Sequence, residues 1–302
     1  MSLPRLLFVT GKGGTGKSTV AAALAIALAR RGGATLVDLD NRRPAARMLA
    51  QPQAENKRDP TAEQLEITAL TPRAELEAFV ERIVPLKMIS RRMLKSRTFG
   101  YVTAALPGLE AFLMMERLRL MAGAAALTDR HVVVDGPAGG NALELLAVAD
   151  GVKRLAPIGT LNRLARELEE FIQDPTRFGA IVTVWPEELA LREALEAAAS
   201  MRERTGIRWV EAVLNGVTDG LFDAAEMAWM RARDNGKHGA LAMHLAMAER
   251  RVASAEFAKR ARLELARADI GVAAIPMLFR RVLARSDLEM LADDLAAQWS
   301  LR

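Results

Sequence analysis

The sequence predicts an α/β fold: a doubly wound, mostly parallel sheet with helices on both faces. Short apolar runs of strand length alternate with longer helical patterns, and glycine-rich or acidic loops follow several of these runs. The chain has 302 residues and is 51% hydrophobic, which is enough to bury a large core. We expect a single domain over residues 1–302. Two helical insertions, at roughly 85–128 and 217–268, are expected to lie together as a helical subdomain beside the ligand-binding edge.

Composition excludes several kinds of site. Cysteine is absent, which excludes disulfides, iron–sulfur clusters and thiolate metal sites. The three histidines lack the spacing of a zinc site. The net charge of +5 is spread along the chain, so we expect a mildly basic surface and no nucleic acid partner. No uncharged apolar run reaches the length of a membrane span and a strand begins almost at once, so we expect no transmembrane segment, no signal peptide and a cytoplasmic location.

The first βα unit carries a phosphate-binding pattern. A strand at 6–9 precedes Gly-Lys-Gly-Gly-Thr-Gly-Lys-Ser, and an alanine-rich helix follows at 21–30. The pattern fits G-x-x-x-x-G-K-[ST], in which glycines bring backbone N–H groups close to phosphate oxygens at a helix start. We expect Lys17 to reach the β- and γ-phosphates as a catalytic residue, and the Ser18 hydroxyl to bind Mg²⁺. The predicted nucleotide-binding residues of the loop are Gly11, Lys12, Gly13, Gly14, Thr15, Gly16, Lys17, Ser18 and Thr19.

The second strand pattern, at 34–37, closes on Asp38-Leu39-Asp40. Loops at the carboxyl edge of a parallel sheet face the ligand crevice. Asp40 is the predicted catalytic carboxylate, which orients the attacking water and belongs to the Mg²⁺ site. Asp38 is expected to hold the Mg²⁺ shell or the loop.

The segment at 85–128 reads as helical and rich in methionine. It follows a polar loop at 51–60, a strand at 65–70 and a helix that starts at Thr71-Pro72. Methionine suits an adaptable client groove and equally suits ordinary helix packing. Both interpretations stay open at this stage.

A third strand pattern, at 131–135, ends in Asp135 and leads into Gly-Pro-Ala-Gly-Gly-Asn and a helix at 142–148. This is the position of a Walker B carboxylate. We expect Asp135 to hold Mg²⁺ through water or to hydrogen-bond Ser18. The N–H groups of Gly139 and Gly140 are expected to sense the γ-phosphate, since glycine lets the loop move.

The remaining chain continues the alternation, and Asn215 ends one of its strands. An asparagine side chain has both a hydrogen-bond donor and an acceptor, although a turn asparagine before Gly216 is the structural alternative. The expected strands lie at 178–185, 207–214 and 270–275, and the expected helices start at Pro186 and cover 240–268 and 287–299.

The loop Lys12-Gly-Gly-Thr-Gly-Lys-Ser resembles the deviant Walker A group. That group includes the arsenite-pump ATPase (ArsA), the tail-anchored-protein targeting ATPases, MinD and ParA, and the nitrogenase iron protein. The resemblance implies the fold of a P-loop NTPase. It also implies that Lys12 crosses a dimer interface to touch the partner's nucleotide. By the same resemblance, Asn215, Pro276 and Met277 would contact adenine.

The branch within the group is indicated by separate segments. Val-Trp-Pro-Glu-Glu-Leu at 184–189 and Pro-Gly-x-x-Glu at 107–110 resemble the arsenite-pump and tail-anchor-targeting proteins. The sequences after Asp40 and Asp135 look more like MinD. The family histidine after Asp40 is missing, and so is the cysteine pair that binds zinc or arsenite in relatives.

The resemblance implies a Mg²⁺-dependent ATPase whose two subunits close on ATP. Its partner would be an identical chain or a paralogous ATPase, and a hydrophobic client protein and peripheral membrane contact are compatible with it. Two alternatives stay open. One is a MinD/ParA-like spatial regulator that acts on membrane or DNA, and the other is an ATP-binding scaffold with negligible turnover.

Overall fold

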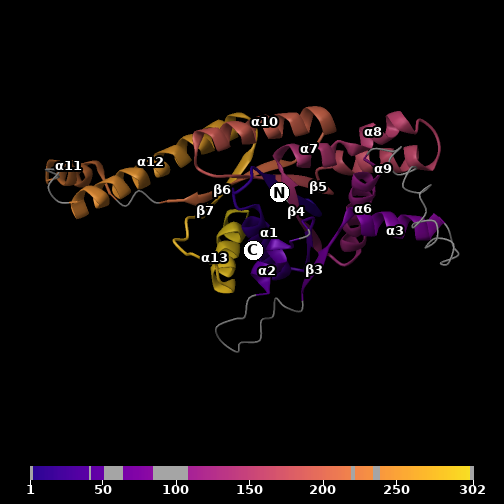
Figure 1. Ribbon diagram of the computed structural model, residues 1–302, viewed down its shortest axis with the longest axis horizontal. Helices are drawn as coiled ribbons and strands as arrows, with labels where there is room; N and C mark the ends of the chain where they lie inside the picture. Colours follow the sequence, from indigo (N-terminus) through magenta and orange to yellow (C-terminus); the bar gives the residue numbers. More distant parts are fainter. Residues whose placement is uncertain are drawn as a thin grey trace.

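Seven parallel strands form one sheet in the order β3-β2-β4-β1-β5-β6-β7. The computed structural model describes residues 3–40, 42–50, 64–83, 108–218, 222–233 and 239–299. Helices cover both faces of the sheet (Figure 1), so the predicted doubly wound α/β fold is confirmed. The strands are β1 (Leu6–Gly11), β2 (Ala34–Asp38), β3 (Leu65–Ala69), β4 (His131–Ala138), β5 (Phe178–Val184), β6 (Val210–Val217) and β7 (Gly271–Pro276).

The central strand β1 is fully buried and divides the core into two parts. Leu6 and Phe8 pack on one face of the sheet, and Leu7 and Val9 pack on the other. Successive side chains of a strand point to opposite faces, so a strand covered on both sides is apolar throughout. The second face is covered by α1 (Lys17–Ala29) and α13 (Arg285–Gln298), which pack on each other.

The strand order reverses at β1, which pairs with β4 on one side and β5 on the other. In doubly wound sheets, ligands bind outside the carboxyl ends of the strands at such a reversal. The loop after β1 and the loop after β4 both lie at this point. The fold therefore places two predicted site loops at the edge where a ligand is expected.

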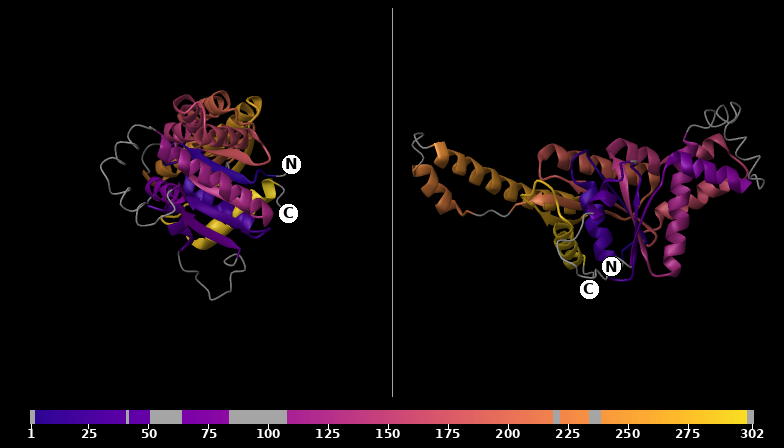
Figure 2. Two further views of the ribbon diagram at one scale, coloured as in Figure 1. Left: turned by 90° about the vertical axis from the view of Figure 1, so that its right-hand side faces the viewer. Right: turned by 60° about the horizontal axis from the view of Figure 1, so that its bottom comes forward.

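The described parts of the two predicted insertions lie at opposite ends of the molecule, not together in one subdomain (Figures 1 and 2). In the first, α6 (Leu109–Leu127) packs on β4 and on α3 (Pro72–Ile83). In the second, α12 (Gly239–Arg267) packs on β6 and β7. The separation follows from the strand order: β4 lies near the β3 edge, whereas β6 and β7 form the other edge. Residues 84–107 of the first insertion, and the polar loop at 51–60, lie outside the described residues.

The described methionines of the first insertion favour packing over a groove. Met114 and Met115 of α6 are buried, and Met121 packs partly buried against the core. Met88 and Met93 lie outside the described residues. In this part of the chain, methionine therefore fills the core.

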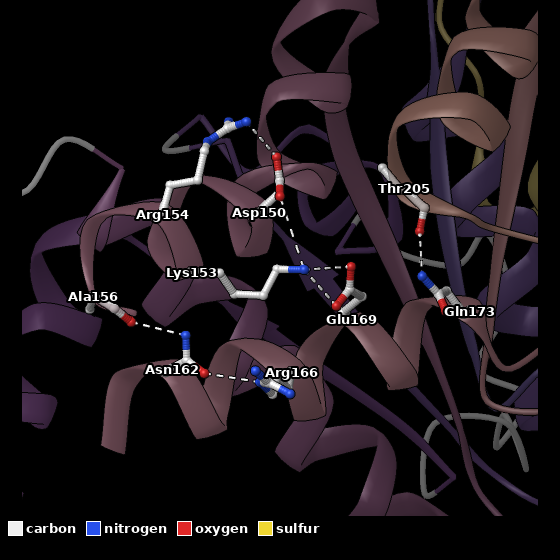
Figure 3. Close-up of polar contacts among 9 residues, drawn as sticks. All are labelled: Asp150, Lys153, Arg154, Ala156, Asn162, Arg166, Glu169, Gln173 and Thr205. Atoms are coloured by element: carbon white, nitrogen blue, oxygen red, sulfur yellow. Dashed lines mark hydrogen bonds and ion pairs between the residues drawn. The ribbon is translucent and has the colours of Figure 1, made fainter. Parts of the chain in front are cut away.

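Two helices that the sequence reading did not single out, α8 (Val148–Leu155) and α9 (Thr160–Gln173), pack beside α6. Polar contacts join them (Figure 3): the Lys153 ammonium donates to both carboxylate oxygens of Glu169 at 2.7 Å, and the Asn162 amide donates to the Ala156 carbonyl at 3.0 Å. The Gln173 amide donates to the Thr205 carbonyl of α10 (Glu188–Thr205) at 3.4 Å. These contacts hold α8, α9 and α10 together at one end of the helical layer that covers the sheet.

At the other end, α11 (Ala224–Arg233) and α12 form a projecting pair that we call the arm (Figure 2). A small cluster of Met227, Leu245 and Ala248 holds the two helices together. The arm also exposes large apolar side chains, among them Trp229, Met243 and Met247. No helix in the described part of the chain combines the length and the apolar character needed to cross a membrane.

Candidate nucleotide site

The loop between β1 and α1 has a backbone shape that only glycine adopts easily. Gly14 and Gly16 have φ of 85° and 86°, in the left-handed region that L side chains rarely occupy. A Cβ on Gly16 would collide with the side-chain amide of Asn215, and one on Gly11 would collide with Thr183. Sterics and φ thus require glycine here, and the loop wraps around the N-terminus of α1.

Side chains from distant strands hold this loop in place. The Thr15 hydroxyl donates to the Lys12 carbonyl at 2.8 Å and lies 2.6 Å from the Thr183 hydroxyl of β5. The Asn215 amide, at the end of β6, donates to the Thr15 carbonyl at 2.8 Å. The Thr10 hydroxyl donates to the Pro137 carbonyl at 2.8 Å, which links the loop to the end of β4. Protein groups alone therefore brace the shape of the loop, and such bracing reduces the cost of ordering donors when a ligand binds.

The helix start places two polar side chains beside the loop. Lys17 is the first residue of α1, and its ammonium donates to the Lys12 carbonyl at 3.3 Å across the loop. The hydroxyl of Ser18 hydrogen-bonds to Asp135. The N-terminus of a helix carries partial positive charge and favours anions. Cation, helix end and loop thus converge on one anion-binding position.

Two buried carboxyl groups face each other behind this helix end. Asp38 and Asp135 are register partners on β2 and β4 and are 0% and 3% exposed. Burial raises the pKa of Asp135 to about 6; the nearby Asp38 charge adds to the shift, and the Ser18 hydrogen bond and Lys17 oppose it. Burial also raises the pKa of Asp38, opposed by the backbone N–H groups of Ala46 and Ala45. The pair therefore tends to hold a proton until a cation replaces it.

These residues fit a Mg²⁺ ion. One carboxylate oxygen of Asp38 and one of Asp135 (Oδ1 in both) is buried and receives no hydrogen bond from any described residue outside the pair. Such oxygens are rare unless a ligand or ion completes them. Mg²⁺ takes oxygen ligands and is usually held by one or two carboxylates, water and phosphate oxygens. Consistent with that sparse protein shell, the described residues contain no cluster of three or more histidine, cysteine or acidic side chains able to hold a metal.

Lys12 lies on the outer side of the loop. Its ammonium forms a 2.8 Å ion pair with Glu193 of α10, and both side chains are about half exposed. Lys12 and Glu193 also line a cavity of about 270 Å³, together with Gly139 and Gly140 at the start of α7 (Gly139–Leu146). The first half of the phosphate loop and the loop after β4 thus share one cavity wall.

The three predicted adenine residues also come together. Asn215 of β6 is opposite Ile275 of β7, and the Met277 N–H donates to the Val217 carbonyl at 2.8 Å. Pro276 is the register partner of Val217. This group adjoins the phosphate loop through the contact of Asn215 with Thr15. The adenine contact itself stays a prediction, but the arrangement it needs is present.

Residues 4–164, more than half of the chain, match the sequence model of a family described as anion-transporting ATPase. The chain belongs to this family. ATPase BagA of Mycobacterium tuberculosis is 30% identical over 210 residues, which cover 66% of this chain and 61% of BagA. A Halobacterium salinarum protein named for the arsenical pump-driving ATPases is 28% identical over 231 residues, covering 70% of this chain and 35% of that protein. The chain therefore spans less than two thirds of the length of these curated relatives.

Within the candidate site, Asp38 and not Asp40 faces Asp135. Asp40 is exposed, and its carboxylate accepts the N–H of Arg42 at 2.8 Å while its carbonyl accepts the N–H of Arg43 at 2.9 Å. In this conformation Asp40 stabilises its own turn, so its catalytic and metal roles stay predictions. The signal that favours Asp38 is the similar place of the two aspartates: each directly follows a run of buried apolar residues, at the end of β2 for Asp38 and within β4 for Asp135.

Two further residues of the site have functions that the sequence reading missed. The Glu193 carboxylate accepts a hydrogen bond from the Lys12 ammonium. The Thr183 hydroxyl lies within hydrogen-bond distance of the Thr15 hydroxyl and is 3.1 Å from the Thr10 carbonyl, to which it can donate. Both come from β5 and α10, far along the chain from the loop. No local pattern signals such contacts, although Glu193 lies just after the Pro-Glu-Glu-Leu segment that resembles the arsenite-pump branch.

Proposed function

We propose that this chain is a Mg²⁺-dependent ATPase in which ATP closes two subunits on each other and drives action on a partner protein. One observation carries the proposal: a phosphate loop braced from β5 and β6 lies beside a Ser18–Asp135–Asp38 group with unpaired carboxylate oxygens. Family membership supports the same activity.

In this proposal the chain's own groups divide the work. The backbone N–H groups of the loop and the ammonium of Lys17 bind the phosphates. Ser18, Asp135 and Asp38 would hold a Mg²⁺ ion, which when bound would supply positive charge to offset the charge of the phosphates. Asp40 orients a water whose oxygen attacks the γ-phosphorus as the bond to the β–γ bridging oxygen breaks. Because Asp40 is exposed, its turn must move against the phosphates before it acts.

Lys12 acts from one subunit on the nucleotide of the other. In the single chain the Lys12 ammonium pairs with the Glu193 carboxylate of the same subunit. When two subunits close, the ammonium leaves Glu193 and binds a phosphate of the nucleotide in the other subunit. An exposed ion pair contributes only about 0–1 kcal/mol, so this exchange is energetically easy. The partner is a second copy or a paralogous ATPase.

The arm is the proposed client surface. It exposes Trp229, Met243, Met247 and Leu263, and a cavity of about 880 Å³ lies between α11 and α12. Exposed methionine and tryptophan suit an adaptable apolar contact. A hydrophobic segment of a client protein fits this chemistry. Action on membrane or DNA, as in a spatial regulator, has no matching feature of comparable clarity among the described residues.

The test compares nucleotide binding with turnover. Wild type is expected to bind ATP and to hydrolyse it only with Mg²⁺. Lys12→Ala should bind ATP nearly as wild type does and lose hydrolysis, whereas Lys17→Ala should lose both. Arg73→Ala, an exposed change on α3, is the matched control and should behave as wild type.

Three outcomes would separate the alternatives. Tight ATP binding with flat turnover in wild type would favour a scaffold. Wild-type turnover in Lys12→Ala would refute the role in trans. ATP-dependent pelleting with liposomes, or salt-sensitive DNA binding, would favour a spatial regulator.

A further inference from the structure

The arm joins the sheet at two segments that also carry the base-site residues. The Thr218 hydroxyl, directly after β6, donates to the Arg251 carbonyl of α12 at 3.3 Å. The guanidinium of Arg251 lies over the ring of Phe279, 4.8 Å from its centroid. Phe279 follows Met277 by two residues. Arg251 therefore contacts one neighbour of Asn215 and one neighbour of Met277.

The Arg251 side chain is held tightly but incompletely satisfied. The residue is partly buried, and its Nε is fully buried without a hydrogen-bond partner among the described residues. A cation over an aromatic face is stabilised more strongly when it is removed from water. An unpaired buried N–H opposes the same arrangement. The cation–π attraction stabilises the contact and the unpaired N–H destabilises it. A contact with such a small net stability can be broken by a small change nearby, as a switch requires.

The loop between β7 and α13 has room to move. Phe279 is 67% exposed and Val282 is 69% exposed, and residues 277–284 form no helix or strand. The loop is anchored on both sides of this exposed stretch, because Leu278 and Leu283 pack partly buried against the core. Between these anchors, segments with few buried contacts open at low free energy. The contact of the Phe279 ring with Arg251 therefore constrains the exposed part of the loop.

We propose that Arg251 and Phe279 form a latch that couples occupancy of the base site to the arm. This inference rests on the proposed function, because it takes the purine base of a nucleotide to bind beside Asn215, Pro276 and Met277. Binding there repositions residues 277–284 and with them Phe279. Since α12 is one continuous helix from Gly239 to Arg267, a shift at Arg251 is transmitted to the whole arm. Arg251 is a positioning residue in this scheme.

Hydrogen–deuterium exchange of the full chain, with and without ADP, tests the latch. In wild type, ADP should change the exchange rate of α11 and α12 amides by about fivefold or more, the low end of coupling between two sites. Phe279→Ala and Arg251→Ala should bind ADP and lose that change. Arg251→Lys should keep part of it, because an ammonium also binds an aromatic face. Arg260→Ala is the control on the same helix: Arg260 lies over Phe257, 4.9 Å from its centroid, and also forms an exposed 2.7 Å ion pair with Glu188 of α10.

The outcomes distinguish the latch from the proposed function. If ADP protects the phosphate loop in wild type while the arm is unchanged, the latch is refuted and the ATPase proposal stands. If ADP neither binds nor protects the loop, the proposed function fails first. If Arg251→Ala unfolds, Phe279→Ala decides, since its exposed ring contributes little to the core. Equal loss of coupling in Arg260→Ala would also overturn the latch, because the effect would then belong to α12 in general.

Discussion

The phosphate loop and the arm differ in how their parts are held. The loop receives hydrogen bonds or close contacts from β4, β5 and β6, and its central hydroxyl, on Thr15, is 3% exposed. Among the described residues, the C-terminal part of α12 packs on β6 and β7 and enters the main core at Ala258, Ala261 and Leu265, whereas the outer part of the arm has only a small cluster of its own. A site that recognises phosphate needs donors fixed in advance, since their ordering would otherwise oppose binding. A surface that responds to a ligand needs a low free energy of movement.

The largest effect is expected from a substitution that distorts the phosphate loop itself. Gly16→Ala places a Cβ at φ 86° against the Asn215 amide, so we expect ATP affinity to fall by more than about 100-fold and stability by about 1–3 kcal/mol. Gly123→Ala is the control, since a Cβ there meets nothing within 4 Å in α6, and it should stabilise by about 0.5–1 kcal/mol. ATP titration and denaturant unfolding measure both effects. Equal behaviour of the two variants would contradict the steric account.

A second test uses the buried carboxyl pair. The pKa of Asp135 is raised to about 6 from an ordinary value of 3.8, so the folded protein keeps a proton that the unfolded chain releases. Without Mg²⁺, stability should therefore fall as pH rises from about 4 to about 6, on the order of 2–3 kcal/mol. Mg²⁺ affinity should rise over the same range, because the ion needs ionised carboxylates.

Asp135→Asn is the control for the pH test. It should weaken the dependence of stability on pH and reduce Mg²⁺ affinity, as unfolding curves and Mg²⁺ titrations at several pH values would show. Asp38 shifts in the same direction, so part of the dependence should remain. A wild-type stability that is flat between pH 4 and 6 would refute the assigned pKa shift.

Removing one brace should have a smaller effect. Asn215→Ala deletes the donor to the Thr15 carbonyl, which should lower stability by about 1 kcal/mol and ATP affinity by about tenfold. Exchange of phosphate-loop amides should increase while exchange in the arm does not. An unchanged loop in this variant would mean that β5 alone determines the shape of the loop.

The smallest expected effect comes from Glu193→Gln. The ion pair with Lys12 is about half exposed, so stability should change by less than about 1 kcal/mol. If Lys12 acts in trans, its release should raise ATP turnover or dimer formation by up to about fivefold. Glu196→Gln, an exposed acid on the same helix, should leave both unchanged. Lower turnover in Glu193→Gln alone would instead assign Glu193 a direct role in the active assembly.

Much of the site could be predicted because its signals are local. Residues 11–18 encode a glycine-rich loop and a helix start within one short stretch, and Asp135 directly follows three buried valines in β4. The strands at 65–69 and 178–184 were also predicted nearly at their observed bounds. The strand predicted at 207–214 is observed at 210–217 instead. Ile207 and Trp209 are buried before it, and the Trp209 carbonyl already accepts the N–H of Ala180 in β5.

Contacts between distant residues could not be predicted in this way. The bond from Asn215 to Thr15 spans 200 residues, and the pair of Lys12 with Glu193 spans 181. Asp40 stood out by its place in the motif, but the strand register brings Asp38 to Asp135. The spacing of motifs along the chain does not reveal which loops lie side by side, because that depends on the order of the strands in the sheet.

The sequence by itself determined the chemistry that this chain can hold: a phosphate cradle, a helix start, a lysine and two carboxylates, each fixed by the backbone demands of a few neighbouring residues. Only the tertiary structure decided which groups share a site. The described parts of the two helical insertions lie toward opposite edges of the sheet, and the arm lies beside the predicted base-binding residues. The physical reason is that the strand order sets these long-range neighbours, and it depends on the packing of the whole core.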